Sequence, residues 1–153
     1  MKTLKEVLAN IKPVDHTRRN DIQAKLDDLT KPQGSLGRLE ELAMRYCLIT
    51  GRDKPVLRNK IIFTCAGDHG VTMEGVSAFP AAVTPQMVLN FLRGGAGVNV
   101  LAKQAGARVI VVDMGVNHDF EPATDLEVRK IGHGTANMAV GPAMTREQAE
   151  ASI

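Results

Sequence analysis

Two short, continuous apolar runs, separated by a helical pattern, constrain the fold more than any other feature of this sequence. The first run covers residues 61–66 and the second covers residues 108–113. Runs without alternating polar residues are typical of strands that are covered on both faces of a sheet. Between them, Thr84 and Pro85 predict a helix start, and apolar residues at helical spacing continue to a stop at Gly106. A strand, a helix and a strand in this order predict a parallel sheet of the α/β class.

The residues before this pattern predict helices instead. Apolar side chains at helical spacing follow a cap at Thr3, recur from Ile22 to Leu29, and recur again after a cap at Ser35. In the third helix we expect one apolar face to be buried, the face that carries Leu36, Leu39, Leu42, Ala43 and Tyr46.

The end of the chain adds two weaker predictions. A third strand is expected at residues 126–131, and Thr145 begins the capping box Thr-Arg-Glu-Gln, which predicts a further helix. Because so short a helix is marginal by itself, the capping box also predicts a sequence truncated from a longer protein. We therefore expect a helical segment of a small domain at residues 1–54 and the N-terminal part of an α/β domain at residues 55–153.

Composition excludes several classes of function. The formal net charge is +2, no dense basic run occurs, and the chain has one Tyr, four Phe and no Trp, so nucleic-acid binding is not expected. The two cysteines form no disulfide-rich pattern, and the apolar runs are far shorter than the roughly 20 residues of a membrane span. Charges interrupt the N-terminus too often for a signal peptide. These features predict a soluble, cytoplasmic protein.

The end of the first predicted strand carries the strongest candidates for a site. Asp68, His69 and Gly70 follow this strand, and Asp113 ends the second strand. In parallel sheets, ligand sites lie at the carboxyl ends of the strands, which favours a function for these side chains. The plainer interpretation is a turn in which Asp68 accepts backbone N–H bonds and Gly70 takes a positive φ.

Three other patterns allow alternative functions. Asp68 and His69 also suit a metal-dependent phosphohydrolase, whose further ligands would come from His118, Asp119 and His133. The glycines at residues 94–97 imitate a dinucleotide fingerprint, but a helix rather than a strand is expected to carry them. The glycine-rich residues 132–137 precede the last helix, where such a loop either cradles phosphate or only connects two elements.

Five stretches in a fixed order resemble one known family: "KPQGSLGRLE" (31–40), "CAGDHGVTMEGVSAFP" (65–80), "VTPQMVLNFLRGGAGVNVLAKQAGA" (83–107), "VVDMGV" (111–116) and "GTANMAVGPAMT" (134–145). From about Leu4 to Ala149 the chain resembles the nicotinate-nucleotide–dimethylbenzimidazole phosphoribosyltransferases of cobalamin biosynthesis. This family transfers ribose 5-phosphate from nicotinate mononucleotide to a nitrogen of 5,6-dimethylbenzimidazole, giving α-ribazole 5′-phosphate and nicotinate. The resemblance implies no metal or NAD cofactor. It implies a doubly wound, Rossmann-like parallel sheet with a small helical domain.

The resemblance also implies where the site lies. In the family, the stretch after Asp68 and His69 helps to line the base pocket, and the matching positions are Phe79, Pro80, Gln86 and Met87. We interpret Asp68 as holding the turn and His69 as a polar contact at the pocket rim. Some relatives carry polar residues at the positions of Phe79 and Met87, so phenolic or purine acceptors remain alternatives to dimethylbenzimidazole.

The family's general-base glutamate and most of its phosphate contacts belong to a later half of the protein. No catalytic residue is therefore assigned within residues 1–153, and we expect these residues alone to be inactive. The resemblance implies a homodimer, or association with the missing C-terminal half. A non-catalytic domain that binds a nucleotide is the remaining alternative.

Overall fold

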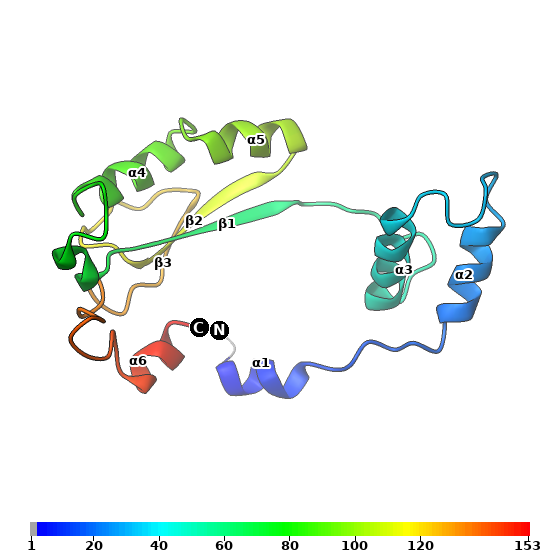
Figure 1. The fold of residues 1–153 in the computed structure, drawn as a ribbon, viewed down its shortest axis with the longest axis horizontal. Helices are drawn as coiled ribbons and strands as arrows, with labels where there is room; N and C mark the ends of the chain where they lie inside the picture. The colour runs from blue at the N-terminus through cyan, green and yellow to red at the C-terminus, as the bar shows by residue number, and fades with distance from the viewer. Residues whose placement is uncertain (1–2) are drawn as a thin grey trace. The chain divides into compact units, whose positions relative to one another are not determined.

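The computed structural model describes residues 3–153 and divides the chain into two compact units, with the division between Arg58 and Asn59. The first unit contains only helices, and the second contains a sheet with helices, as the element order in Figure 1 shows. The assignment of domains to residues 1–54 and 55–153 stays a prediction.

The helical unit contains α1 (Leu4–Asn10), α2 (Arg19–Asp27) and α3 (Arg38–Thr50). The predicted cap of α1 is confirmed, because the Thr3 hydroxyl accepts the Glu6 N–H while the Glu6 carboxylate accepts the Thr3 N–H. A small apolar core joins α2 to α3 and consists of Ile22, Met44, Cys47 and Leu48, with Leu26 packed against it.

The start of α3 differs from the prediction. Ser35 does not cap this helix; the cap position is Gly37, at φ 51° and ψ −122°, and the helix begins at Arg38. The predicted apolar face is also wrong, since Leu39 and Leu42 are exposed while Met44, Cys47 and Leu48 are buried. The helix has therefore turned a different side toward the core of its unit.

Glu40 explains this rotation. Its carboxylate lies 2.9 Å from the Lys31 ammonium and accepts the Leu36 N–H at 3.0 Å, and both ion-pair partners are nearly buried. Because Glu40 points inward, the residues one and two turns later, Met44 and Leu48, point inward with it. A charged residue thus selects the buried face of α3.

The second unit is built on a parallel sheet with the strand order β1-β2-β3. The strands are β1 (Ile61–Gly67), β2 (Arg108–Gly115) and β3 (Leu126–Val128), and both neighbouring pairs are parallel. The predicted α/β class is therefore confirmed. The remaining elements are the 3₁₀ helix η1 (Gly70–Glu74) and the helices α4 (Val83–Leu92), α5 (Gly97–Ala105) and α6 (Arg146–Ala151).

The predicted helix between the first two strands is broken into α4 and α5. Gly94, at φ 78°, lies in the corner between them, and Asn99 closes the corner by donating to the Phe91 carbonyl at 3.0 Å. Gly106 ends α5 in the left-handed conformation, as predicted. Thr84 does not cap α4, since Ala82 occupies the cap position. The glycines at 94–97 therefore form a helix–helix corner, which differs from the strand-to-helix turn of a dinucleotide site.

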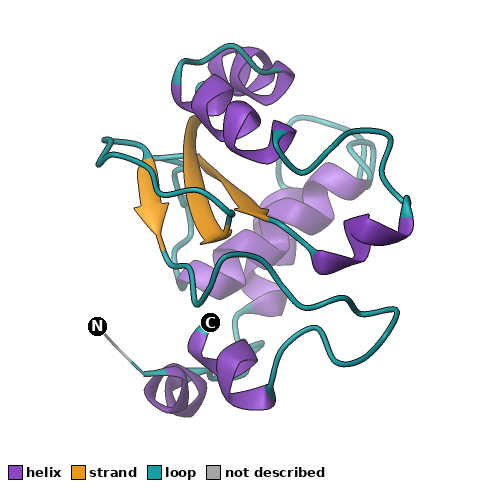
Figure 2. Cartoon of the chain, turned by 90° about the vertical axis from the view of Figure 1, so that its left-hand side faces the viewer, coloured by secondary structure: helices purple, strands orange, loops and turns teal. Residues whose placement is uncertain are grey.

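Only one face of β1 is well covered. Val88 of α4 packs against Val111 and Val116, with Ala66 beside them, and Figures 1 and 2 show α4 and α5 on one side of the strands. Residues alternate along a strand, so Ile61 and Phe63 point to the opposite face, where the Phe63 side chain is 63% exposed. The expectation that both faces of this strand are covered is wrong for the described residues, because α4 packs on the Ala66 face.

Candidate functional site

Asp68 stands at the centre of the region where β1 ends. Its buried carboxylate accepts the Asn117 N–H at 2.8 Å, its own N–H donates to the Gly115 carbonyl, and its carbonyl accepts the Thr135 N–H at 3.0 Å. Asp68 thus accepts a backbone N–H bond, as predicted, but from the segment after β2 rather than from its own turn. One residue joins the ends of β1 and β2 to the glycine-rich loop.

Gly70 is needed for a reason other than the one predicted. It does not take a positive φ; instead, a Cβ at this position would lie 2.6 Å from the Asn137 nitrogen and 2.8 Å from the Thr135 carbonyl oxygen. The Gly70 N–H donates to that same Thr135 carbonyl at 3.1 Å. The absence of a side chain therefore lets the start of η1 pack directly on the glycine-rich loop.

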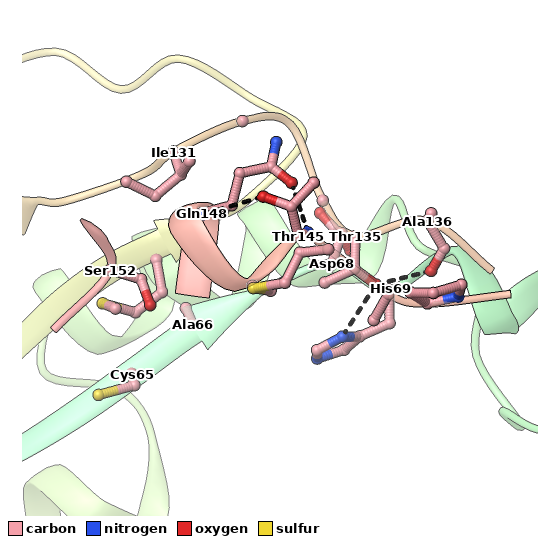
Figure 3. A pocket seen from close by; sticks show the side chains of 18 of the residues that line it. Cys65, Ala66, Asp68, His69, Ile131, Thr135, Ala136, Thr145, Gln148 and Ser152 are labelled. Carbon is pink, nitrogen blue, oxygen red and sulfur yellow. Dashed lines mark hydrogen bonds between the residues drawn. The ribbon is translucent and has the colours of Figure 1, made fainter. Parts of the chain in front are cut away.

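His69 lies between these two contacts and is exposed. Its Nδ1 atom is 3.5 Å from the Thr135 hydroxyl oxygen, and the backbones of the two residues form a parallel bridge (Figure 3). The Thr135 hydroxyl also donates to the Ala136 carbonyl at 3.0 Å. The His69 ring is therefore placed beside the glycine-rich loop at the rim of a pocket.

Two pockets meet at this rim and share residues 65–69. The larger, with a volume of about 810 Å³, is lined by the glycine-rich loop, by Met114 and by the beginning of α6, where Thr145 and Gln148 form the predicted capping box (Figure 3). The smaller, of about 380 Å³, lies between the end of β1 and α4. The strip of residues 65–69 is called the shared strip below.

The smaller pocket gathers most of the residues that the sequence assigned to a base site. Phe79, Pro80 and Met87 line it together with Asp68 and His69. Gln86 is the exception: it is exposed on α4 and is not among the lining residues of either pocket described here.

The walls of the smaller pocket combine apolar and polar side chains. Phe79 is 69% exposed, so it is not part of the core, and the Ser77 hydroxyl fixes its backbone by bonding to both the N–H and the carbonyl of Phe79. Val88 and Phe91 lie on the α4 side, and the polar lining residues are Thr64, Asp68, His69, Thr72, Ser77 and Thr84. A pocket of this composition suits a flat ring that also carries polar atoms.

Asp113 does not face either pocket. It is fully buried, accepts the Gly115 and Val116 N–H groups through Oδ1, and lies 3.0 Å from the Lys130 ammonium through Oδ2. Sequence reasoning placed Asp113 correctly at the end of β2 but missed Lys130. A lysine within a predicted strand, close in sequence to a buried carboxylate at a strand end, is the only signal that could have pointed to it.

The electrostatics around Lys130 favour its charged form. Burial lowers the pKa of Lys130, but the contacts of its ammonium with the Asp113 and Asp119 carboxylates, and their negative charges, outweigh burial and raise this pKa above its ordinary value. The hydrogen bond from Lys130 also lowers the pKa of the Asp119 carboxyl. Lys130 is thus held as an ammonium ion over a wide range of pH.

The phosphohydrolase alternative gains no support from the described residues. Asp119 lies between Lys130 and His133, at 3.2 and 3.7 Å, rather than beside Asp68 and His69. Within residues 3–153, no three His, Cys, Asp or Glu side chains come together as a metal site would require. Nor does any described helix have both the length and the apolarity to cross a membrane.

Comparison with known proteins identifies the family. A family model described as "Phosphoribosyltransferase" matches residues 11–153. The chain belongs to this phosphoribosyltransferase family. It is 61% identical, over its whole length, to a nicotinate-nucleotide–dimethylbenzimidazole phosphoribosyltransferase of Citrifermentans bemidjiense, of which it covers 44%. It is 62% identical over 143 residues to a protein of the same description from Chlorobaculum parvum, of which it covers 40%.

A solved structure supports the same relationship. The crystal structure of the nicotinate-nucleotide–dimethylbenzimidazole phosphoribosyltransferase of Thermus thermophilus matches 90% of this chain with a TM-score of 0.85 and 48% identity, over 42% of that protein. The chain therefore spans less than half the length of the relatives it matches. The chain shares the family of these relatives, but a match to less than half of each relative does not by itself give the chain the activity of the whole enzyme.

Proposed function

We propose that residues 1–153 are the part of a nicotinate-nucleotide–dimethylbenzimidazole phosphoribosyltransferase that binds the acceptor base, in the synthesis of the lower ligand of cobalamin. The relatives named above carry this description. The observation that carries the proposal is the smaller pocket, where Phe79, Pro80 and Met87 converge with Asp68 and His69 at the carboxyl end of β1. This is the position at which parallel sheets bind ligands.

The pocket offers both kinds of contact that a benzimidazole needs, apolar side chains for its ring and polar groups for its nitrogens. Phe79 and Met87 offer apolar contacts to a flat ring. A pair formed by the Phe79 ring and an aromatic base would gain roughly 0.5–1.5 kcal/mol beyond the free energy from the buried area. We assign the polar contact with a ring nitrogen to His69 at the rim; the Thr72 hydroxyl donates to the His69 carbonyl at 3.0 Å and is left to accept. We therefore assign 5,6-dimethylbenzimidazole, or a closely similar base, to this pocket.

The reaction exchanges one C–N bond for another at C1′ of the ribose. The bond from C1′ to the nicotinate nitrogen breaks, a bond from C1′ to the base nitrogen forms, and the base loses its N–H proton. Asp68 is a poor candidate for removing this proton, because its buried carboxylate already accepts the Asn117 N–H. We assign the proton transfer to a glutamate beyond residue 153, as the resemblance implies.

The partners follow from the same proposal. Nicotinate mononucleotide and the base are the small-molecule substrates, no cofactor is required, and a second copy of the chain or the C-terminal half of the protein completes the enzyme. We place the protein in the cytoplasm, where both substrates would be available.

A chimeric enzyme tests this function directly. This chain would replace the matching 44% of the C. bemidjiense relative, and nicotinate release would be followed with nicotinate mononucleotide and 5,6-dimethylbenzimidazole. We expect turnover within about tenfold of that relative, a difference of about 1.4 kcal/mol in the barrier. A folded chimera that releases no nicotinate would contradict the proposal. Residues 1–153 alone are the control and should show no turnover.

A further inference from the structure

Lys130 makes an unusual number of contacts for one side chain. It follows β3, is only 13% exposed, and places its ammonium 3.0 Å from Asp113, 3.1 Å from the Val116 carbonyl and 3.2 Å from Asp119. It also donates to the His118 carbonyl, and its Nζ lies 5.9 Å from the centre of the Phe120 ring. Nearly all its partners lie between residues 113 and 119, which comprise the last three residues of β2 and the four that follow it. This segment is called the β2 exit below.

The β2 exit is not well fixed by apolar packing alone. Val116 is buried in the core, but Asn117, His118 and Asp119 are exposed. The carbonyls of Val116 and His118 are both directed at the Lys130 ammonium, which helps to hold the exposed residues 117–119, because hydrogen bonds to a charged group are stronger than those between neutral groups. Lys130 is therefore a brace between the end of β3 and the β2 exit.

The braced segment holds the shared strip. The Asn117 N–H donates to the Asp68 carboxylate at 2.8 Å, and the Gly115 carbonyl accepts the Asp68 N–H at 3.0 Å. Asp68 in turn accepts the Thr135 N–H through its carbonyl at 3.0 Å. Movement of the β2 exit would therefore move Asp68, and with it the residues that line both pockets.

We propose that Lys130 is a positioning residue for the base site. Lys130 touches no substrate itself. It fixes the β2 exit, and the Asn117 N–H of this segment holds Asp68. Asp68 in turn places its neighbour His69 at the rim. The assignment of the base to the smaller pocket rests on the proposed function, whereas the brace itself rests only on the contacts of Lys130. The two can therefore be tested separately.

The test uses a double variant, since the single variant Lys130→Met would leave the buried Asp113 carboxylate without its partner and is at risk of unfolding. Lys130→Met with Asp113→Asn removes the ammonium and the buried charge together, and keeps the Oδ1 acceptor for Gly115 and Val116. The matched control is Arg108→Met with Asp125→Asn, which removes an exposed ion pair of 2.5 Å between the start of β2 and the residue before β3. Neither Arg108 nor Asp125 lines a pocket described here.

Amide hydrogen exchange of residues 1–153 gives the first measurement. In the Lys130 double variant we expect exchange at Asn117 and Thr135 to accelerate by about tenfold or more, with Val112 in the centre of the sheet unchanged. The control variant should leave all three rates unchanged. Unchanged exchange at Asn117 would overturn the brace. Equal acceleration at Asn117 and Val112 would also overturn it, because Lys130 would then stabilise the whole unit rather than the β2 exit.

Titration with 5,6-dimethylbenzimidazole gives the second measurement, read from the chemical shifts of the His69 ring. We expect the Kd to rise about tenfold in the Lys130 double variant and less than about twofold in the control, as for a contact residue displaced from its productive position. A local change in exchange with an unchanged Kd would overturn the positioning role. If the unmodified chain does not bind the base, the proposed pocket fails, while the exchange result still tests the brace.

Discussion

Two nearly buried lysine–carboxylate pairs, one in each unit, hold the described part of the chain in different ways. Lys31 and Glu40 lie close in sequence and fix a single junction, the start of α3. Lys130 and Asp113 connect the segment after β3 to the end of β2, and through the Val116–Asn117 peptide they also connect to the end of β1. The first pair decides how one helix is turned; the second decides the shape of a site.

The difference shows where polar groups carry structural information. In the helical unit, four apolar residues form the core, and the ion pair only selects which side of α3 faces it. In the α/β unit, the pockets lie where the strands end and apolar packing is thin. There, the hydrogen bond that the Asp68 carboxylate accepts from Asn117 and the one that Lys130 donates to Val116 set positions that apolar contacts leave open.

The largest effect on this comparison should come from Lys130→Met alone. Leaving the buried Asp113 carboxylate unpaired should lower the free energy of unfolding of the α/β unit by about 3 kcal/mol, measured by urea denaturation. Lys31→Met is the matched change in the helical unit. It should cost less and leave amide exchange in the sheet unchanged, because Glu40 makes only local contacts. If Lys130→Met and Lys31→Met lower the free energy of unfolding equally, the two ion pairs do not differ in the way proposed.

Gly70→Ala should have the next largest effect. The new methyl group would meet backbone atoms of residues 135–137 at less than 3.0 Å, so the glycine-rich loop would have to move. We expect a loss of about 2 kcal/mol in the free energy of unfolding. Gly132→Ala, in the same loop but with open space around it, is the control and should be nearly neutral. If Gly70→Ala is as mild as its control, the close packing of η1 on this loop is wrong.

Phe79→Ala should separate binding from stability. Because Phe79 is 69% exposed and lines the smaller pocket, its loss should weaken binding of the base by roughly 10- to 100-fold with almost no change in Tm. Leu101→Ala removes a side chain of similar exposure on α5, outside both pockets, and should change neither quantity. A large fall in Tm with normal base binding would make Phe79 a structural residue.

The smallest predicted effect concerns alkaline pH. The pKa of Lys130 is raised in the folded state, so its contribution to stability is complete below the unfolded-state value of about 10.4 and is lost as the pH rises through the folded-state pKa. The stability difference between the chain and Lys130→Met/Asp113→Asn should therefore be constant at neutral pH and shrink above about pH 10.4. A difference that persists at higher pH would show that the ammonium is not its source.

The sequence predicted the sheet better than it predicted the packing. The apolar runs placed β1 and β2 within a residue or two, and the cap at Thr3 and the capping box at Thr145 were correct, because both signals are local. The buried face of α3 was predicted wrongly, since Glu40 faces inward, where it pairs with Lys31 and accepts the Leu36 N–H. No periodic pattern contains that contact.

For the candidate site too, some residues could be predicted from the sequence and others could not. Position at a strand end made Asp68 and His69 candidates, while Phe79, Pro80 and Met87 came from the family resemblance rather than from any pattern in this chain; that they bind the base stays a prediction. The connection from Lys130 to Asp68 was not foreseen, because it passes through backbone atoms of the β2 exit. Backbone donors and acceptors are the same in every residue except proline, so the sequence does not show which of them will meet.

The central claim, that the acceptor base binds between the end of β1 and α4, has a direct test in the methionine methyl groups. Met87 lines the smaller pocket, whereas Met114 and Met144 line the larger one. With ¹³C-methyl methionine in residues 1–153, titration with 5,6-dimethylbenzimidazole should shift the Met87 methyl signal and give contacts from it to the base. The signals of Met114 and Met144 should stay in place. Shifts at Met114 and Met144 without a shift at Met87 would contradict the account.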